Sequence, residues 1–303
     1  MIRIEKEDVT LLCEERNMDG KKALVVKGFE GGSAVLDLSD CNIAEIDRKA
    51  FLSCKILKHL ILPGTVKHLG EWAFSKCTNL ERVEIAGEFR GNVFDRGVFD
   101  GCDALKEICF SDLCEDAGIL VACNANRMPN DHLLRSTELG QQSWFDQWDL
   151  TLLSLLRADD AEGSSNVALC GEEDISYDGV GMVDGEMPGE TEEFIRNAAK
   201  NKCLLTICRL KHDTFLGDKV REQLYVYIRE RGFGQKKDSF WRTLKEECSE
   251  DMECWQMYLD IVQPDRGTLN RMIEDLSYAQ IQAKAFLIDA AGDSEDEWGD
   301  LLL

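Results

Sequence analysis

The chain has 303 residues, 44% of them hydrophobic and only four of them proline, a composition typical of a folded protein of about two domains. Its net charge at pH 7 is −23, and so negative a chain repels both the nucleic-acid backbone and anionic membranes, so we expect neither as a partner. No stretch approaches the roughly 18–20 apolar residues of a membrane span, which argues against membrane insertion.

The cysteines and the N-terminus bear on the compartment. Thirteen cysteines are present, an odd number, and Met1-Ile-Arg-Ile-Glu-Lys6 lacks the apolar run of a signal peptide. Free thiols are typical of a reducing compartment. We therefore predict a cytoplasmic protein, or a surface or secreted protein if a signal peptide has been removed. The sequence predicts no particular oligomeric state.

The negative charge is concentrated in two segments. Residues 36–110 hold 12 acidic and 10 basic residues, whereas residues 158–193 hold 12 acidic residues and no Lys or Arg. Residues 285–303 hold six acidic residues and again no base. Residues 36–110 are therefore nearly neutral, and the acidity belongs to a loop at 158–192 and a tail at 291–303.

The first 35 residues predict extended segments joined by turns. Apolar stretches at 9–13 and 23–27 flank the pair Asp19-Gly20, which is typical of a β-hairpin turn. Because the terminal unit of a solenoid must be atypical on its outer side, we interpret this segment as an N-terminal cap.

Residues 43–110 repeat themselves three times, with Cys-to-Cys steps of 23 and 25 residues. Each unit has a small or branched residue followed by Phe, a Cys three residues after the Phe, and apolar residues at fixed offsets beyond it. The units are Ala50-Phe51, Cys54, Leu57 and Leu60; Ala73-Phe74, Cys77, Leu80 and Val83; and Val98-Phe99, Cys102, Leu105 and Ile108. A period in this range predicts a solenoid with one strand and a short return per coil.

The residues between these landmarks identify the type of repeat. The segment 36–43 fits L-x-L-x-x-C-x-I, the strand and turn of a leucine-rich repeat. The next unit, with Pro63, Gly70, Ala73-Phe74 and Cys77 in place, resembles the BspA-like (bacterial surface-antigen) leucine-rich repeat. This resemblance covers residues 36–112 and departs at 86–93, where two residues are added. It implies a solenoid that presents a row of strands to a protein partner.

The repeated Phe and Cys positions have two interpretations, a buried core or a functional cluster. Coils stacked about 5 Å apart would place Cys54, Cys77 and Cys102 in a regular buried column, which is unsuited to a tetrahedral zinc shell. We therefore predict that the cysteines and phenylalanines form the core, with no metal and no cofactor. The binding surface must then be the outward side of the strands. With strands near 60–62, 83–85 and 108–110, its candidate residues are Ile61, Glu84 and Cys109.

Residues 126–303 predict an all-helical second domain, which follows the solenoid and its cap at residues 1–125. The stretch 116–123 could be one last, degenerate coil. Apolar residues then recur at helical spacing in several segments, separated by the acidic loop. Two of these segments resemble each other loosely and resemble ankyrin-like or other helical repeats. The predicted helices cover residues 143–156, 194–208 (interrupted near Asn201), 218–231, 239–247, 253–262 and 268–290.

The sequence contains none of the familiar catalytic motifs. No phosphate-binding glycine loop, no G-x-S-x-G, no C-x-x-C and no H-E-x-x-H is present. Cys208 and His212 have the spacing of a thiol–imidazole pair on a helix, which leaves a cysteine-dependent hydrolase as an alternative. A calcium-binding regulator is a further alternative, because carboxylates of the acidic loop could bind Ca²⁺, although their order differs from that of known calcium loops. These carboxylates are Asp174, Asp178, Asp184 and Glu186.

The preferred reading is an α+β protein, a short leucine-rich-repeat β-solenoid followed by an all-α domain, that acts in non-catalytic protein–protein recognition or scaffolding. Its expected partner is a protein or peptide. The acidic tail ends in an apolar group that could form a second contact, a short linear motif for a partner groove. The residues of this motif are Trp298, Leu301, Leu302 and Leu303.

Overall fold

The computed structural model describes residues 1–6, 8–18, 20–87, 93–111, 113–125, 127–128, 137–161 and 188–293. It divides into two compact units, residues 1–152 with 211–216, and residues 153–210 with 217–303. The predicted boundary between domains, after residue 125, stays a prediction. Most of the acidic loop and nearly all of the tail lie outside the described residues.

The chain begins with three antiparallel strands, β1 (Ile2–Lys6), β2 (Val9–Met18) and β3 (Lys21–Gly31). Met18 pairs with Lys21, so β2 and β3 form the predicted hairpin, and Gly20 between them has a φ of +78°. Strand β3 then pairs in parallel with β5 (Ile43–Ile46). The antiparallel strands thereby continue one sheet of the solenoid, as a cap does.

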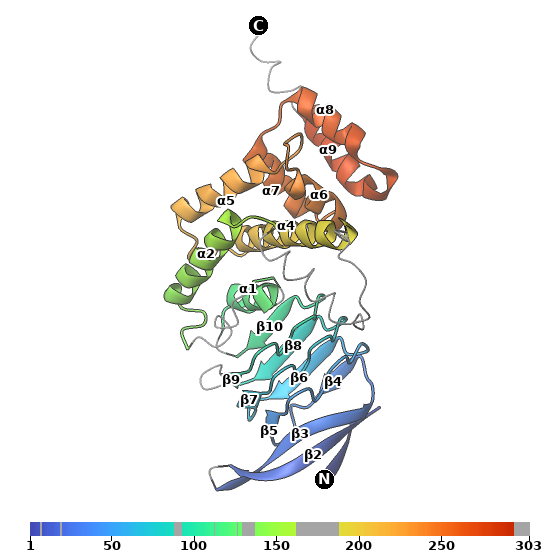
Figure 1. Ribbon diagram of the computed structural model, residues 1–303, viewed down its shortest axis with the longest axis vertical. Coiled ribbons are helices and arrows are strands. Elements are labelled where there is room, and N and C mark those ends of the chain that lie inside the picture. The colour runs from blue at the N-terminus through green and yellow to red at the C-terminus, as the bar shows by residue number, and fades with distance from the viewer. Residues whose placement is uncertain are drawn as a thin grey trace, which may run out of the picture. The chain divides into compact units, whose positions relative to one another are not determined.

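The repeats coil between two parallel sheets (Figure 1). One sheet contains β4 (Val35–Asp37), β6 (His59–Pro63), β8 (Arg82–Ala86) and β10 (Glu107–Phe110). The other continues the cap through β5, β7 (His68–Leu69) and β9 (Val93–Phe94). The prediction of one strand per coil was therefore incomplete, because the return segments also pair, over two to four residues, into a second sheet.

The core of the solenoid follows the repeat. In β6 and β8, Leu60, Leu62, Val83 and Ile85 are buried, while the residues between them face outward. Phe51, Phe74 and Phe99 stack on one another, with ring centroids 5.1 and 5.8 Å apart and planes within 15° of parallel. Phe29 of β3 extends this stack at 5.1 Å from Phe51, so the cap and the coils share one core.

Residues beyond β10 form helix α1 (Glu115–Ala125), and not the degenerate coil expected from the sequence. Most of its apolar residues are buried, among them Leu120 and Val121. Because β10 is the last strand of its sheet, the helix packed beside it covers that edge (Figure 1). The repeats thus end in a helical cap.

The rest of the described chain is helical, so the overall prediction of a β-solenoid followed by helices is confirmed. Helix α4 is continuous across Asn201, where an interruption was predicted. The single helix predicted at 268–290 is divided, because Ser277 starts a new segment with a capping box closed by Gln280. The elements are α2 (Gln142–Arg157), α4 (Pro188–Lys211), α5 (Asp218–Glu230), α6 (Ser239–Glu247), α7 (Met252–Val262), α8 (Arg266–Asp275), η2 (Tyr278–Gln280) and α9 (Ile281–Asp293).

Candidate functional site

The three residues predicted to form a binding face lie in one row across the outer side of the β4-β6-β8-β10 sheet. Ile61 pairs directly with Glu84, and Glu84 pairs directly with Cys109. Asp37 of β4 extends the row beyond Ile61. All four are at least partly exposed, whereas their neighbours along each strand are buried. The parallel register places them side by side because equivalent residues of successive coils align.

A second row on the same face carries charged residues that the sequence reasoning did not single out. The imidazole Nε2 of His59 lies 3.0 Å from Glu84 Oε1, and Arg82 Nε donates to the same oxygen at 2.7 Å. Arg82 also donates to Glu107 Oε2 at 2.5 Å. Exposed ion pairs stabilise a fold by roughly 0–1 kcal/mol each, so this ladder contributes little to folding. Its main effect is to fix the positions of charges around the apolar Ile61.

The thiol of Cys109 is held in its neutral form. Burial, together with a hydrogen bond to the Glu107 carboxylate, raises the pKa of Cys109 to about 12. A thiol with this pKa is almost entirely protonated at neutral pH and is a poor nucleophile. Cys109 therefore contributes to the face as a weak donor and a small apolar group.

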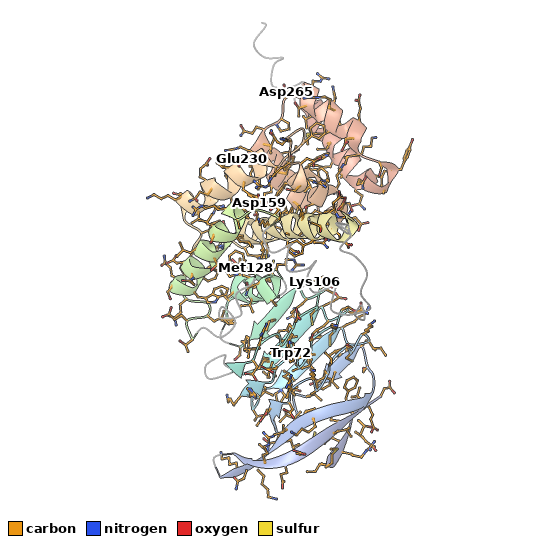
Figure 2. All side chains as sticks on the ribbon, viewed as in Figure 1. Trp72, Lys106, Met128, Asp159, Glu230 and Asp265 are labelled. Carbon is orange, nitrogen blue, oxygen red and sulfur yellow. The ribbon has the colours of Figure 1, made fainter. Side chains whose placement is uncertain are left out.

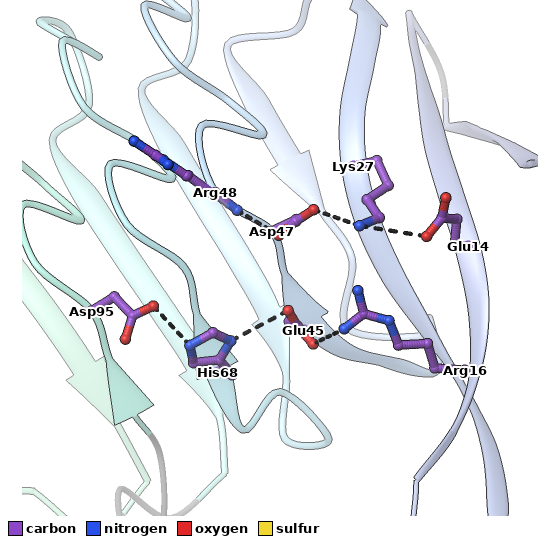
Figure 3. Close-up of polar contacts among 8 residues, drawn as sticks. All are labelled: Glu14, Arg16, Lys27, Glu45, Asp47, Arg48, His68 and Asp95. Atoms are coloured by element: carbon purple, nitrogen blue, oxygen red, sulfur yellow. Dashed lines mark hydrogen bonds and ion pairs between the residues drawn. The ribbon is translucent and has the colours of Figure 1, made fainter.

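A polar network crosses the other sheet of the solenoid (Figure 3). Arg16 of β2 pairs with Glu45 Oε2 at 2.8 Å, and the other carboxylate oxygen of Glu45 lies 3.4 Å from His68 Nδ1. On its far side, His68 Nε2 lies 3.0 Å from Asp95. With a carboxylate at each ring nitrogen, His68 is engaged on both sides. The network joins successive coils to the cap.

A second line of ion pairs runs parallel to this network (Figure 3). Lys27 of β3 lies 2.6 Å from Asp47 and 3.4 Å from Glu14. Burial opposes ionisation of Asp47, but Lys27 and the backbone N–H of Arg48 outweigh it, so the pKa of Asp47 falls below its usual value. These contacts join the first coil to strands β2 and β3 of the cap.

The repeated cysteines lie inside the coil. The Sγ of Cys77 donates to the carbonyl oxygen of Phe51 at 3.1 Å, and that of Cys102 donates to Phe74 at 3.1 Å. Proximity to Cys77 and burial raise the pKa of Cys102 well above its usual range. Each thiol thus links its own coil to the preceding one. Within the described part of the chain, no three His, Cys, Asp or Glu side chains are grouped as a metal site requires.

The structure describes His212, the predicted partner of Cys208, but not the residues predicted for the calcium site or the tail motif. His212 Nδ1 lies 3.1 Å from Asp116 Oδ1 at the start of α1, and the second oxygen of Asp116 accepts from Thr214. The histidine proposed as the partner of Cys208 is thus engaged with a carboxylate. The four calcium candidates, Asp174, Asp178, Asp184 and Glu186, lie outside the described residues. So do the tail residues Trp298, Leu301, Leu302 and Leu303.

Comparison with known families defines the class. A parallel solenoid with a repeated Phe and Cys core and an outward row of strand residues is the architecture of a leucine-rich-repeat protein. Residues 35–125 match the BspA type leucine rich repeat region in six copies. The N-terminal part of the chain is therefore a BspA-type leucine-rich-repeat region, as the sequence predicted, and such repeats serve protein–protein interaction in general. The match ends at residue 125 and leaves the loose resemblance of the helices to helical repeats as a prediction.

Two solved structures are similar over part of the chain. A leucine-rich-repeat protein of T. pallidum is 22% identical, with a TM-score of 0.25, over 32% of this chain and 47% of that one. A leucine-rich cell surface protein from Faecalibacterium prausnitzii A2-165 is 18% identical, with a TM-score of 0.29, over 36% of this chain and 30% of that one. The chain thus spans less than half the length of either protein. No curated protein matches it. None of the described helices has the length and apolar character needed to span a membrane.

Proposed function

We propose that this protein is a non-catalytic recognition or scaffolding module that binds a protein or peptide across the outer face of the β4-β6-β8-β10 sheet. The observation that carries the proposal is the row formed by Ile61, Glu84 and Cys109, aligned in register on three successive coils. A row of this kind offers one contact per coil to an extended partner. We propose the helical region as a second part of the scaffold.

The chemistry of the face supports this proposal. The fold buries alternate strand residues, so the outward residues are not needed to form the core. Exposed Val35 and partly exposed Ile61 supply apolar contact area. Around them, Arg82 and Glu84 are already held in place by ion pairs, which lowers the entropic cost of using them in binding. Preorganised polar groups around an apolar centre are typical of protein interfaces.

Site-specific cross-linking in the source cell tests the proposal. A photoactivatable residue replaces Ile61 in one variant and Ile281 in another, since Ile281 is exposed on α9 in the other compact unit. We expect a discrete cross-linked protein partner from position 61 and none from position 281. The same products from both positions, or none from position 61, would overturn the proposal.

A matched pair of substitutions separates binding from folding. Ile61→Lys places an ammonium opposite Glu84, where it can form an ion pair, so the fold should tolerate it. Ile281→Lys makes the same chemical change far from the repeats in sequence. We expect Ile61→Lys to abolish capture of the cross-linked partner with an unchanged melting temperature, and Ile281→Lys to leave capture intact. Loss of capture in both variants would contradict the proposed face.

A further inference from the structure

Trp72 occupies a backbone position that favours glycine. Lys49, Trp72 and Gly97 are equivalent residues of three successive coils, and all three have positive φ, at 58°, 55° and 64°. Of the three, only Gly97 adopts this conformation without steric cost. A bulky aromatic residue with positive φ is an outlier among proteins. The backbone therefore gives no reason for a tryptophan at position 72.

The core gives no reason for it either. The aromatic stack of the solenoid is made by the Phe two residues later in each coil, and Trp72 is not part of it. Trp72 is partly exposed, and Figure 2 labels it on the solenoid. Its indole covers Gly97, where an added Cβ would lie 2.6 Å from the ring. The guanidinium carbon of Arg48 is 4.8 Å from the ring centroid, and Lys49 Nζ is 5.3 Å from it. Two cations from the preceding coil thus flank an exposed aromatic ring.

The charge around Trp72 is positive, in a chain whose net charge is −23. The backbone N–H of Trp72 donates to the backbone carbonyl of Arg96 at 3.2 Å, so Arg96 belongs to the equivalent turn of the next coil. Among the described residues, Lys49 and Arg96 have no ion-pair partner, whereas Arg48 pairs with Glu71 at 3.5 Å. Asp100, beside Gly97, is the other carboxylate at this turn. Three cations and two carboxylates leave an excess of one positive charge.

The nearest remaining carboxylates have other partners. Asp47 is held by Lys27 at 2.6 Å, and Asp95 is held by His68 at 3.0 Å. Both are directed to the network on the adjoining sheet (Figure 3). An exposed tryptophan beside arginine and lysine side chains combines the residue types that dominate the binding energy of protein interfaces.

We propose that this turn surface, formed by Arg48, Lys49, Trp72 and Arg96, binds an acidic peptide segment of a partner protein. The indole would pack against an apolar side chain of the peptide, and the guanidinium groups would bind its carboxylates. The surface is separate from the row through Ile61, so it is a second site on the same solenoid. The cations beside the indole favour an acidic ligand at this turn, and the negative charge of the rest of the chain disfavours the same ligand elsewhere on the surface.

Binding of a short, capped, fluorescein-labelled peptide tests this site. The peptide carries five Glu and two Leu residues in a Gly-Ser background, and a control peptide has Gln in place of each Glu. Fluorescence anisotropy with the full chain should show binding of the Glu peptide that weakens as salt is added. We expect Trp72→Gly and Arg96→Glu each to weaken binding by about tenfold or more. Glycine suits the positive φ, so Trp72→Gly should keep the melting temperature within a few degrees.

Matched variants make the result decisive. Lys219→Glu on α5 changes the net charge by the same amount as Arg96→Glu, and it should leave the affinity within about twofold. Ile61→Ala, which shortens the apolar side chain of the proposed sheet face without a change of charge, should also leave the affinity unchanged, which separates this site from that face. The proposal is overturned if the Glu peptide does not bind or if the Gln peptide binds equally well. It is also overturned if Ile61→Ala weakens binding as much as Trp72→Gly does.

Discussion

Gly118 of α1 lies directly against the carbonyl oxygen of Ile108 in β10, so closely that a Cβ on Gly118 would be 2.5 Å from that oxygen. Contacts this short do not occur between real Cβ atoms and carbonyl oxygens, so only glycine fits. The close approach lets α1 cover the last strand of the repeat sheet. The end of the solenoid therefore depends on one residue without a side chain.

Gly118→Ala should destabilise the protein by about 1–3 kcal/mol, since the helix must move away from β10 to accommodate the methyl group. The sign of this change in unfolding free energy is informative, because in an exposed helix interior alanine is favoured over glycine by about 1 kcal/mol. Urea unfolding followed by circular dichroism measures the change. Gly292→Ala on α9 is the matched control, as nothing lies within 4 Å of its Cβ position, and it should be neutral or stabilising. Equal behaviour of the two variants would show that α1 does not rest on β10.

The repeat made much of this fold predictable. Equivalent positions such as Phe51 and Phe74 had to stack, because no single coil can bury its own apolar side. The same alignment predicted the strand register, and the structure places Ile61, Glu84 and Cys109 in one row on that register. Whether the row binds a partner stays a prediction, since a pattern of burial shows which side chains face outward and not what they contact.

Other features could not be predicted, for identifiable reasons. Helix α1 is apolar on most sides because it is largely buried, so residues 116–123 lack the one-sided periodicity of a surface helix. The pairing of β7 and β9 involves two residues each, too few for an alternating pattern. The surface around Trp72 had a signal that was missed. In the aligned repeats, Trp72 takes the place of Gly97, and such an exchange at a glycine position indicates a strained residue.

The same position on the two coils that flank Trp72 gives predictions of opposite sign. Lys49→Gly relieves a positive φ, a gain of about 1–2 kcal/mol that exceeds the roughly 0.5–1 kcal/mol entropic cost of glycine. It should therefore raise the free energy of unfolding slightly. Gly97→Ala places a side chain on a residue with positive φ and also brings a methyl group too close to the Trp72 ring. It should lower the free energy of unfolding by more than 1 kcal/mol. Urea denaturation of both variants measures the signs. Lys55→Gly, at an exposed position without positive φ, is the control and should be destabilising.

The raised pKa of Cys109 predicts that both the stability of the protein and the reactivity of this thiol depend on pH. Burial, with the Glu107 carboxylate, raises the pKa of this thiol from 9.0 to about 12, so the folded state favours the neutral form. The resulting contribution to stability is complete below pH 9 and is lost as the pH rises towards 12. Alkylation of Cys109 at pH 8 should be at least tenfold slower than in urea. Glu107→Gln should raise the rate several-fold by lowering the pKa, which mass spectrometry of the modified peptide can follow. An unchanged rate in that variant would remove Glu107 as a cause.

The second compact unit contains a buried ion pair between Lys202 of α4 and Asp160. Lys202 Nζ lies 2.7 Å from Asp160 Oδ1 and donates to the carbonyl of Ala158 at 2.7 Å. The side chains of Lys202 and Asp160 are only 3% and 9% exposed. Either charge left alone in such an environment is strongly destabilising. We expect Lys202→Met or Asp160→Leu alone to cost about 3–5 kcal/mol.

The double variant distinguishes a charge effect from a packing effect. If the cost arises from an uncompensated buried charge, Lys202→Met with Asp160→Leu should recover most of the stability, because two apolar side chains of similar size replace the pair. Chemical denaturation of all four proteins gives the coupling energy, which should exceed about 2 kcal/mol. The exposed pair of Lys200 and Glu247, 3.0 Å apart, is the control and should couple by less than about 1 kcal/mol. Similar coupling in both pairs would mean that the Lys202–Asp160 contact is solvated.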